Sequence, residues 1–192
     1  MAVFTRIILV ACLAVCVSGA FKIRDDANGV PRSASEGDVI RDLLARHVKY
    51  GIPQPVGSLQ VKLGLYVEAV TEVDVEKGTV EVVGFLSLQW EDPRLRFEHS
   101  DPFHEVKDVR LPASEVWRPD IELYTQFGSW TYQKHAMELA VNHPMGVLSQ
   151  YRSTGQWTVS EATAERVEAK YECCPDTYVF VAYNLTLQKQ DL

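Results

Sequence analysis

Two runs of alternating apolar and polar residues most constrain how this chain can fold. From Leu59 to Ala69 every second residue is apolar, and the same period of two returns from Val80 to Trp90. Such a period is typical of half-buried β-strands. We therefore predict a hairpin that turns at Lys77-Gly78. Phe85 lies on the mostly polar face of the second strand, where core packing does not explain an aromatic ring.

The segment from Ser33 to Tyr50 has the spacing of one amphipathic helix. Ser33 with Glu36, or else Asp38, can cap its start, and Gly51 follows its end. The expected apolar face consists of Ile40, Leu43, Leu44 and Val48.

Further strands are expected at Ile121 to Tyr124 and at Tyr178 to Gln188. One helix followed by strands about every ten residues predicts a mainly β fold, an N-terminal helix with a β-sandwich. The last strand carries Asn184-Leu-Thr186, an acceptor for N-glycosylation, with Asn184 on its outward face.

Residues 1–20 are predicted to be a secretory signal peptide. Arg6 is their only charge, an apolar run from Ile7 to Val17 follows it, and Ser18-Gly19-Ala20 supplies small residues for cleavage. A retained N-terminal anchor is the alternative. Cleavage would remove Cys12 and Cys16 and leave residues 21–192 as one secreted domain.

The charge of the chain limits its partners. The formal net charge is −7, and loss of Arg6 makes it −8. No basic patch is present, which argues against nucleic acid or an anionic membrane surface as a partner. After the signal peptide no apolar stretch is long enough to cross a bilayer, so we expect no membrane span. We expect no metal and no cofactor.

Cys173 and Cys174 are the remaining cysteines and are adjacent. Their Cα atoms lie about 3.8 Å apart, below the usual disulfide range of roughly 4.4–6.8 Å. A bond between them would close a small ring and stiffen a loop tip, with little gain in stability. From the dipeptide alone, free thiols or pairing with other chains are the better interpretation.

The aromatic residues around this pair change that balance. Tyr171 and Tyr178 flank the cysteines, and Tyr124, Trp130 and Phe85 stand in short polar contexts. Singly, each ring is best explained by packing. Gathered around one cavity, they would bind a quaternary or protonated amine, each contact contributing on the order of 0.5–2 kcal/mol.

These motifs resemble a known family, the Cys-loop (nicotinic-type) neurotransmitter-gated ion channels and the soluble acetylcholine-binding proteins. The resemblance covers the ligand-binding domain and nearly all of residues 21–192. Its most specific elements are Trp117-Arg-Pro-Asp120 and Tyr171-Glu-Cys-Cys174. The other motifs, in family order, are Leu88-Gln-Trp-Glu-Asp-Pro-Arg-Leu95, Gly128-Ser-Trp130 and Gly155-Gln-Trp157.

The resemblance implies an immunoglobulin-like β-sandwich and a pentamer, either homomeric or heteromeric, with acetylcholine or a similar cation between neighbours. Trp130 would supply the main cation–π face, and the loop tipped by a Cys173–Cys174 disulfide would close over the ligand. Phe85 would belong to the complementary face. The full predicted ligand set is Tyr124, Trp130, Tyr171, Cys173, Cys174, Tyr178 and Phe85.

One departure from the family is large. Only five residues separate Tyr124 from Trp130, where the family has dozens. The resemblance implies that inner strands, part of the complementary face and the namesake cysteine-bounded loop are missing. A splice form, a wrongly assembled gene and true divergence are equally compatible with this internal deletion.

Three other interpretations stay open. His99-Ser-Asp101 with His104-Glu105 could form a catalytic or metal cluster, but the spacing fits no zinc helix motif, and a surface loop is the better interpretation. The chain could also be the extracellular fragment of a channel subunit. A subunit that modulates others is the third possibility.

We predict that this chain, expressed alone, is less stable than a full-length relative and binds agonist weakly or not at all. The reason is that loss of central strands leaves apolar surface uncovered and backbone groups unpaired. Thermal unfolding and titration with a nicotinic ligand measure this. A cooperative transition together with tight binding would contradict it.

Overall fold

The computed structural model describes residues 4–9, 16–17, 35–53, 57–95, 108–123, 126–142, 148–153 and 155–190. The chain divides into two compact units. Unit 1 comprises residues 1–13, 60–90 and 120–192, and unit 2 comprises residues 14–59 and 91–119. Each is described by itself below.

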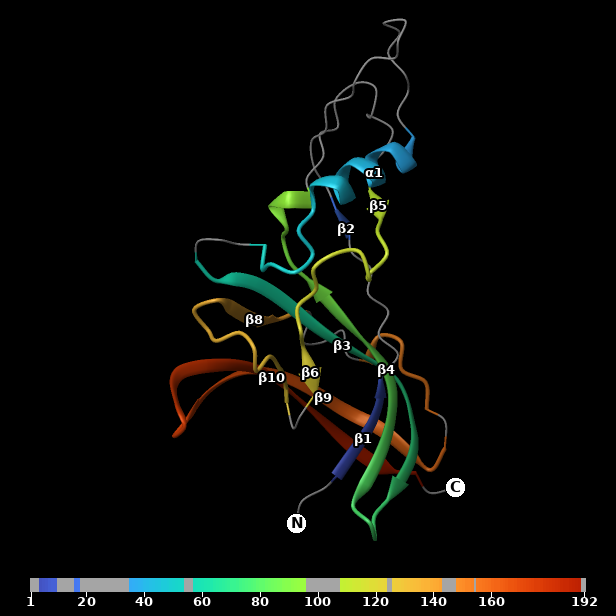
Figure 1. Cartoon of the computed structure of the whole chain (residues 1–192). Helices are drawn as coiled ribbons and strands as arrows, with labels where there is room; N and C mark the ends of the chain where they lie inside the picture. The colour runs from blue at the N-terminus through green and yellow to red at the C-terminus, as the bar shows by residue number, and fades with distance from the viewer. Residues whose placement is uncertain are drawn as a thin grey trace, which may run out of the picture. The chain divides into compact units, whose positions relative to one another are not determined.

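The first sheet of unit 1 contains the predicted hairpin. β3 (Leu59–Asp74) and β4 (Thr79–Gln89) pair antiparallel, and the full strand order is β1-β4-β3-β8 (Figure 1). The prediction of alternating burial is confirmed from Leu59 to Val67. It is wrong at Ala69, because a bulge after Val67 shifts the register and buries Val70 instead.

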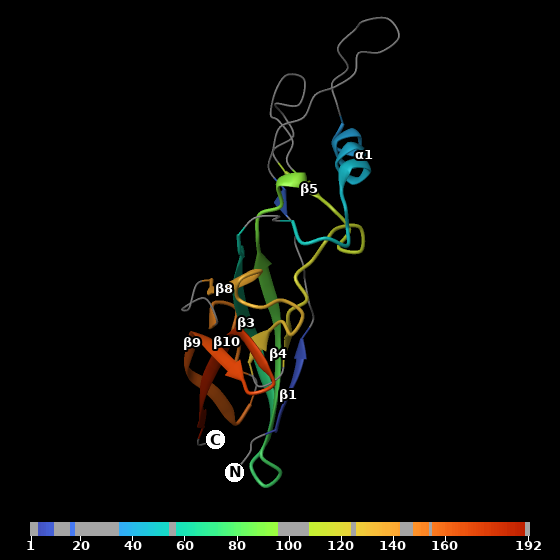
Figure 2. The same ribbon diagram turned by 60° about the vertical axis from the view of Figure 1, so that its left-hand side comes forward.

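The outer edge of this sheet is formed by the N-terminal segment. β1 (Phe4–Leu9) runs parallel to β4, from Phe4 opposite Thr79 to Leu9 opposite Gly84, and Figure 2 shows the two strands side by side. β8 (Met137–Val141) forms the opposite edge. The signal peptide stays a prediction, since pairing in the uncleaved chain does not test cleavage.

The second sheet of unit 1 has the order β6-β7-β10-β9. β10 (Cys174–Lys189) begins four residues before the predicted strand, and it pairs along most of its length with β9 (Trp157–Tyr171). β9 was not predicted as a strand. The two short strands of this sheet are β6 (Glu122–Leu123) and β7 (Phe127–Gly128).

Tyr183 of β10 connects the two sheets. Its hydroxyl donates a hydrogen bond to the Leu63 carbonyl (3.0 Å) and accepts one from the Leu65 backbone nitrogen (3.1 Å), both on β3. The ring also meets Phe127 edge-on at 5.8 Å between centroids. Burial raises the pKa of Tyr183 to about 12. The mainly β sandwich predicted from the sequence is confirmed.

Unit 2 contains the predicted helix, which is shorter than expected. α1 (Glu36–Arg46) begins at the N-cap Ser35, whose hydroxyl and backbone share a capping box with Asp38. Ser33 lies outside the described residues. Tyr50 is wrong as the helix end, and Val48 is wrong as a buried residue, because the chain becomes extended at His47 and leaves Val48 60% exposed.

The core of unit 2 packs α1 against three later segments: η1 (Pro93–Leu95), β5 (Val109–Arg110) and the turn before Trp117. β5 also pairs with β2 (Cys16–Val17). The buried apolar residues of this core are Val39, Leu43, Leu95, Val109, Leu111 and Val116.

Two further observations concern the surface. Asn184 and Thr186 are both exposed on β10, so the predicted glycosylation acceptor faces outward. Among the described residues, no helix combines the length and the apolar composition that crossing a membrane requires.

We expect Tyr183→Phe to lower the free energy of unfolding by about 1–3 kcal/mol, because the Leu65 backbone nitrogen loses the hydroxyl to which it donates. The Leu63 carbonyl keeps a second donor, the Asn142 backbone nitrogen at 2.7 Å. Urea unfolding at neutral pH measures this. The folded-state pKa of Tyr183 is raised, so its contribution is complete below about pH 10 and is lost between about pH 10 and 12. This alkaline loss should be absent from the variant.

Tyr50→Phe is the matched control, since Tyr50 is 89% exposed and its hydroxyl should matter little. Equal stability of the Tyr183→Phe protein and the wild type would contradict the assigned role of Tyr183.

Candidate functional site

Four aromatic rings from distant parts of unit 1 form one cluster, which we call the aromatic cluster. Trp130 lies at its centre, with centroid distances of 4.9 Å to Tyr171, 5.4 Å to Tyr178 and 5.7 Å to Phe180. Tyr171 and Tyr178 meet edge-on at 6.0 Å. The structure therefore brings together three of the rings predicted from the sequence.

The cluster has a buried base and an open rim. Tyr178 and Phe180 are 7% and 3% exposed, whereas Trp130 and Tyr171 are 42% and 38% exposed. A single exposed aromatic ring is ordinary, but exposed apolar surface gathered in one place is a feature of recognition sites. Phe180 was not predicted, although its place two residues after Tyr178 on β10 puts it on the same strand face.

The cysteine pair lies at the tip of the β9–β10 hairpin. Tyr171 ends β9 opposite Cys174, the first residue of β10, and Cys173 stands in the turn between them. The structure holds both as thiols, with 2.6 Å between their Sγ atoms. Contact with Cys173 raises the pKa of the Cys174 thiol, so Cys174 stays protonated at neutral pH. The disulfide remains a prediction.

The backbone that carries Trp130 is fixed by a buried hydroxyl. Ser129 is 2% exposed, and its Oγ donates to Asp120 Oδ1 at 2.6 Å. The same oxygen accepts hydrogen bonds from the backbone nitrogens of Thr131 and Tyr132, each at 3.1 Å. The Ser129 hydroxyl thus fixes the backbone immediately after Trp130. Its partner Asp120 is the last residue of the Trp117-Arg-Pro-Asp120 motif.

Gly128 allows β7 to approach β10 closely. A Cβ atom at this position would stand 2.2 Å from the Phe180 ring, well inside contact distance. The strand that leads into Trp130 can therefore pack on Phe180 only if this residue is glycine.

A chain of alternating charges links the segment after Trp130 to the hairpin. Lys134 Nζ lies 2.6 Å from Glu168 Oε1 on β9, and Arg166 Nη2 lies 2.7 Å from the same oxygen. Arg166 Nε reaches Glu138 of β8 at 2.5 Å, and this bond raises the pKa of Arg166. Hydrogen bonds, first from Lys134 and then from Arg166, lower the pKa of Glu168. Solvent screens these partly exposed pairs, so each contributes little energy, but they constrain geometry.

The backbone of Lys134 adds a second link, since its nitrogen donates to the Thr177 carbonyl of β10 at 2.8 Å. One residue is therefore bonded to both strands of the hairpin. The distance between Trp130 and the two tyrosines is set by these links.

The other predicted residues have different surroundings. Phe85 stacks on its cross-strand partner Tyr66, with 4.7 Å between centroids and 7° between planes. Both rings lie on the face of the β3–β4 pair opposite the buried leucines. Tyr124, His99, Asp101, His104 and Glu105 lie outside the described residues.

The chemistry of the cluster is that of electron-rich ring faces. Such faces attract a cation when water is excluded, by on the order of 0.5–2 kcal/mol for each ring. Among the described residues no group of three or more His, Cys, Asp and Glu could hold a metal ion. The arrangement is suited to binding an organic cation.

Comparison with known proteins gives an independent result. The sequence profile of the family described as neurotransmitter-gated ion-channel ligand binding domain matches residues 36–126 and 124–190. These two matches meet at the short connection before Trp130, where a stretch was expected to be missing.

The acetylcholine receptor subunit alpha-type acr-16 of Caenorhabditis elegans is 24% identical over 214 residues, covering 83% of this chain and 42% of that subunit. The neuronal acetylcholine receptor subunit alpha-4 of Homo sapiens is 21% identical over 228 residues, covering 91% and 36%. The chain thus spans about two fifths of the length of these relatives. Both alignments are longer than the whole chain of 192 residues, so each contains gaps at which the relative has residues that this chain lacks.

We expect Ser129→Ala to lower the free energy of unfolding by about 1–3 kcal/mol, since two backbone nitrogens and a carboxylate lose their partner. Urea unfolding followed by circular dichroism measures this. Ser114→Ala is the matched control, because the Ser114 hydroxyl is exposed and, within the described part of the chain, is bonded only to Glu115 at 3.4 Å. Equal effects of the two changes would show that the Ser129 hydroxyl does not fix this backbone.

Proposed function

Because the chain belongs to the neurotransmitter-gated ion-channel ligand binding domain family, we propose that it is a secreted module like the acetylcholine-binding proteins. It binds a cationic amine neurotransmitter in an aromatic cage at the interface between subunits. Membership makes the chain a ligand-binding domain rather than an enzyme. The relatives named above are acetylcholine receptor subunits, which makes acetylcholine the first ligand to test.

The aromatic cluster is the observation that carries this proposal. The rings of Trp130 and Tyr171 are partly exposed, with 4.9 Å between their centroids, next to the buried rings of Tyr178 and Phe180. A quaternary ammonium group has a spread positive charge and an apolar surface, and both suit such rings. Cys173 and Cys174, joined by a disulfide after export, close the cage from the hairpin tip. Tyr124, which lies outside the described residues, is the remaining member of the proposed ligand set.

Phe85 supports a site shared between two subunits. It is half-buried on β4 and stacks on Tyr66, so it presents a rigid aromatic surface on the face opposite the buried leucines. A neighbouring subunit in a homomeric or heteromeric pentamer contributes this surface as the complementary wall. A glycan on exposed Asn184 marks a face of β10 that stays open to solvent in that assembly.

The alternative is the extracellular ligand-binding fragment of a nicotinic-type channel subunit, located on the outer face of the plasma membrane. The observation behind this alternative is that the relatives named above are acetylcholine receptor subunits. The transcript discriminates the two. A stop codon after Leu192 supports the secreted protein, and further exons that encode apolar segments of about 20 residues support the channel.

The test compares acetylcholine with its uncharged isostere, in which a tert-butyl group replaces the trimethylammonium group. We expect calorimetric titration to detect weak binding of acetylcholine and weaker binding of the isostere. Trp130→Ala should weaken acetylcholine binding about 2- to 30-fold, the range of one cation–π contact.

Trp157→Phe is the control, because Trp157 begins β9 at the end of the hairpin opposite the cysteines. Equal affinity for acetylcholine and its isostere, or no loss on changing Trp130, would overturn the cage. Native mass spectrometry reports the oligomeric state. Acetylcholine binding that is found only in samples containing pentamers would support a site between subunits.

A further inference from the structure

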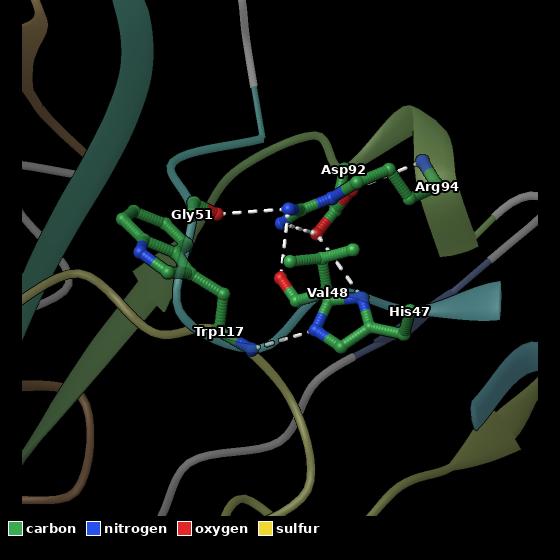
Figure 3. A network of polar contacts seen from close by, with 6 residues as sticks. All are labelled: His47, Val48, Gly51, Asp92, Arg94 and Trp117. Atoms are coloured by element: carbon green, nitrogen blue, oxygen red, sulfur yellow. Dashed lines mark hydrogen bonds and ion pairs between the residues drawn. The ribbon is translucent and has the colours of Figure 1, made fainter. Parts of the chain in front are cut away.

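A buried polar network in unit 2 has no part in the proposed ligand site. Figure 3 shows the His47 imidazole between the Trp117 backbone nitrogen and the Asp92 carboxylate. Trp117 N donates to His47 Nε2 at 2.9 Å, and His47 Nδ1 lies 3.8 Å from Asp92 Oδ2. The side chains of His47 and Asp92 are 1% and 3% exposed. His47 is the residue at which α1 ends.

The hydrogen bond from Trp117 fixes the tautomer of His47. A backbone N–H can only donate, so Nε2 must offer its lone pair and carry no proton. The proton of the neutral ring is therefore on Nδ1, which faces Asp92. At 3.8 Å the Nδ1–Oδ2 contact is too long for a hydrogen bond, and Nδ1 is a buried nitrogen without a hydrogen-bond partner among the described residues.

Asp92 is already neutralised by a better partner. Arg94 donates a hydrogen bond to each carboxylate oxygen of Asp92, from Nε to Oδ1 at 2.8 Å and from Nη2 to Oδ2 at 2.8 Å. The guanidinium also donates from Nη1 to the carbonyls of Val48, at 2.9 Å, and Gly51, at 2.8 Å. Such a two-pronged pair is strong and oriented. Arg94 thus neutralises the negative charge of Asp92, which leaves little of that charge to stabilise a protonated His47.

The balance of charges around the ring opposes protonation. Loss of hydration on burial lowers the pKa of His47, Asp92 raises it, and Arg94 lowers it again. These two charges come from the segment after β4, and the Val116-Trp117 segment contributes a backbone donor. On the helix side, Arg46 is paired with Asp42 at 2.6 Å. His47 is therefore neutral at neutral pH, and its contact with Asp92 is not an ion pair.

We propose that His47 is a pH-sensitive latch of unit 2. The neutral ring ties the end of α1 to the Trp117 backbone, and a proton on Nε2 releases that tie. Protonation places two N–H donors face to face, so Trp117 loses its acceptor. The helix end and the Trp117 segment, 70 residues apart in the chain, then separate locally. The latch does not depend on the proposed ligand.

The sign of the pH effect follows from the lowered folded-state value. The unfolded chain takes up the proton first, at the ordinary imidazole pKa of about 6.5. Stability from the latch is complete above about pH 6.5 and is lost as the pH falls toward the lower folded-state pKa. Within that window the folding equilibrium constant falls by up to about tenfold for each pH unit.

The test measures urea unfolding of the full chain between about pH 7.5 and 5, with His47→Gln and His135→Gln for comparison. Glutamine at position 47 can still accept from Trp117 but does not titrate. We expect it to remove up to about a tenfold change per pH unit in the folding equilibrium constant. His135 is 72% exposed, and its Nδ1 lies 4.0 Å from Asp176, so His135→Gln should keep the wild-type pH dependence.

A second measurement keeps the proposal testable if the His47→Gln protein does not fold. In the wild type, ¹⁵N NMR should show His47 as the Nδ1–H tautomer at about pH 7.5, titrating below about 6.5. The exchange rate of the Trp117 amide, corrected for intrinsic exchange, should rise with the same midpoint. Two results would overturn the latch. One is an Nε2–H tautomer of His47, and the other is a Trp117 amide whose corrected exchange rate does not change as His47 titrates.

Discussion

Unit 1 depends on the hydrogen bonds by which Tyr183 joins its two sheets. The hydroxyl meets an acceptor and a donor of β3, so one side chain fixes the position of β10 against the first sheet. β10 pairs in turn with β7 and β9. The same strand begins at Cys174 and carries Tyr178 and Phe180. Whatever locates β10 therefore locates the base of the aromatic cluster as well.

The sequence alone predicts those strands and helices that have one buried face and one solvent-exposed face. The β3–β4 hairpin was predictable because large apolar residues alternate there. β9 was not, because three of the four half-buried positions after Val159 are alanines (Ala162, Ala164 and Ala169), which do not indicate a strand. The helix end was misplaced because what stops α1 at His47 is a bond to Trp117, far away in sequence.

The site shows the same division. Trp130, Tyr171 and Tyr178 could be selected because aromatic residues beside a cysteine pair are chemically unusual, and their proximity is a finding of the structure. The Ser129 hydroxyl could not be selected, since a serine that supports a backbone looks like any other serine. Phe180 was within reach, because alternation along β10 gives it the face of Tyr178. The distances between Trp130 and the two tyrosines depend on how distant segments pack together, which the residue pattern within each segment does not indicate.

The polar groups that specify this fold are few and buried. Exposed pairs such as Arg41–Asp38 are screened by solvent and contribute little to stability. The Ser129 and Arg94 contacts differ, because removal of one partner leaves a buried polar or charged group unpaired. The place of β1 in the first sheet has a consequence for export. If residues 1–20 are cleaved from the chain, β1 is lost with them, and the backbone of β4 from Thr79 to Gly84 then has no strand partner on that side.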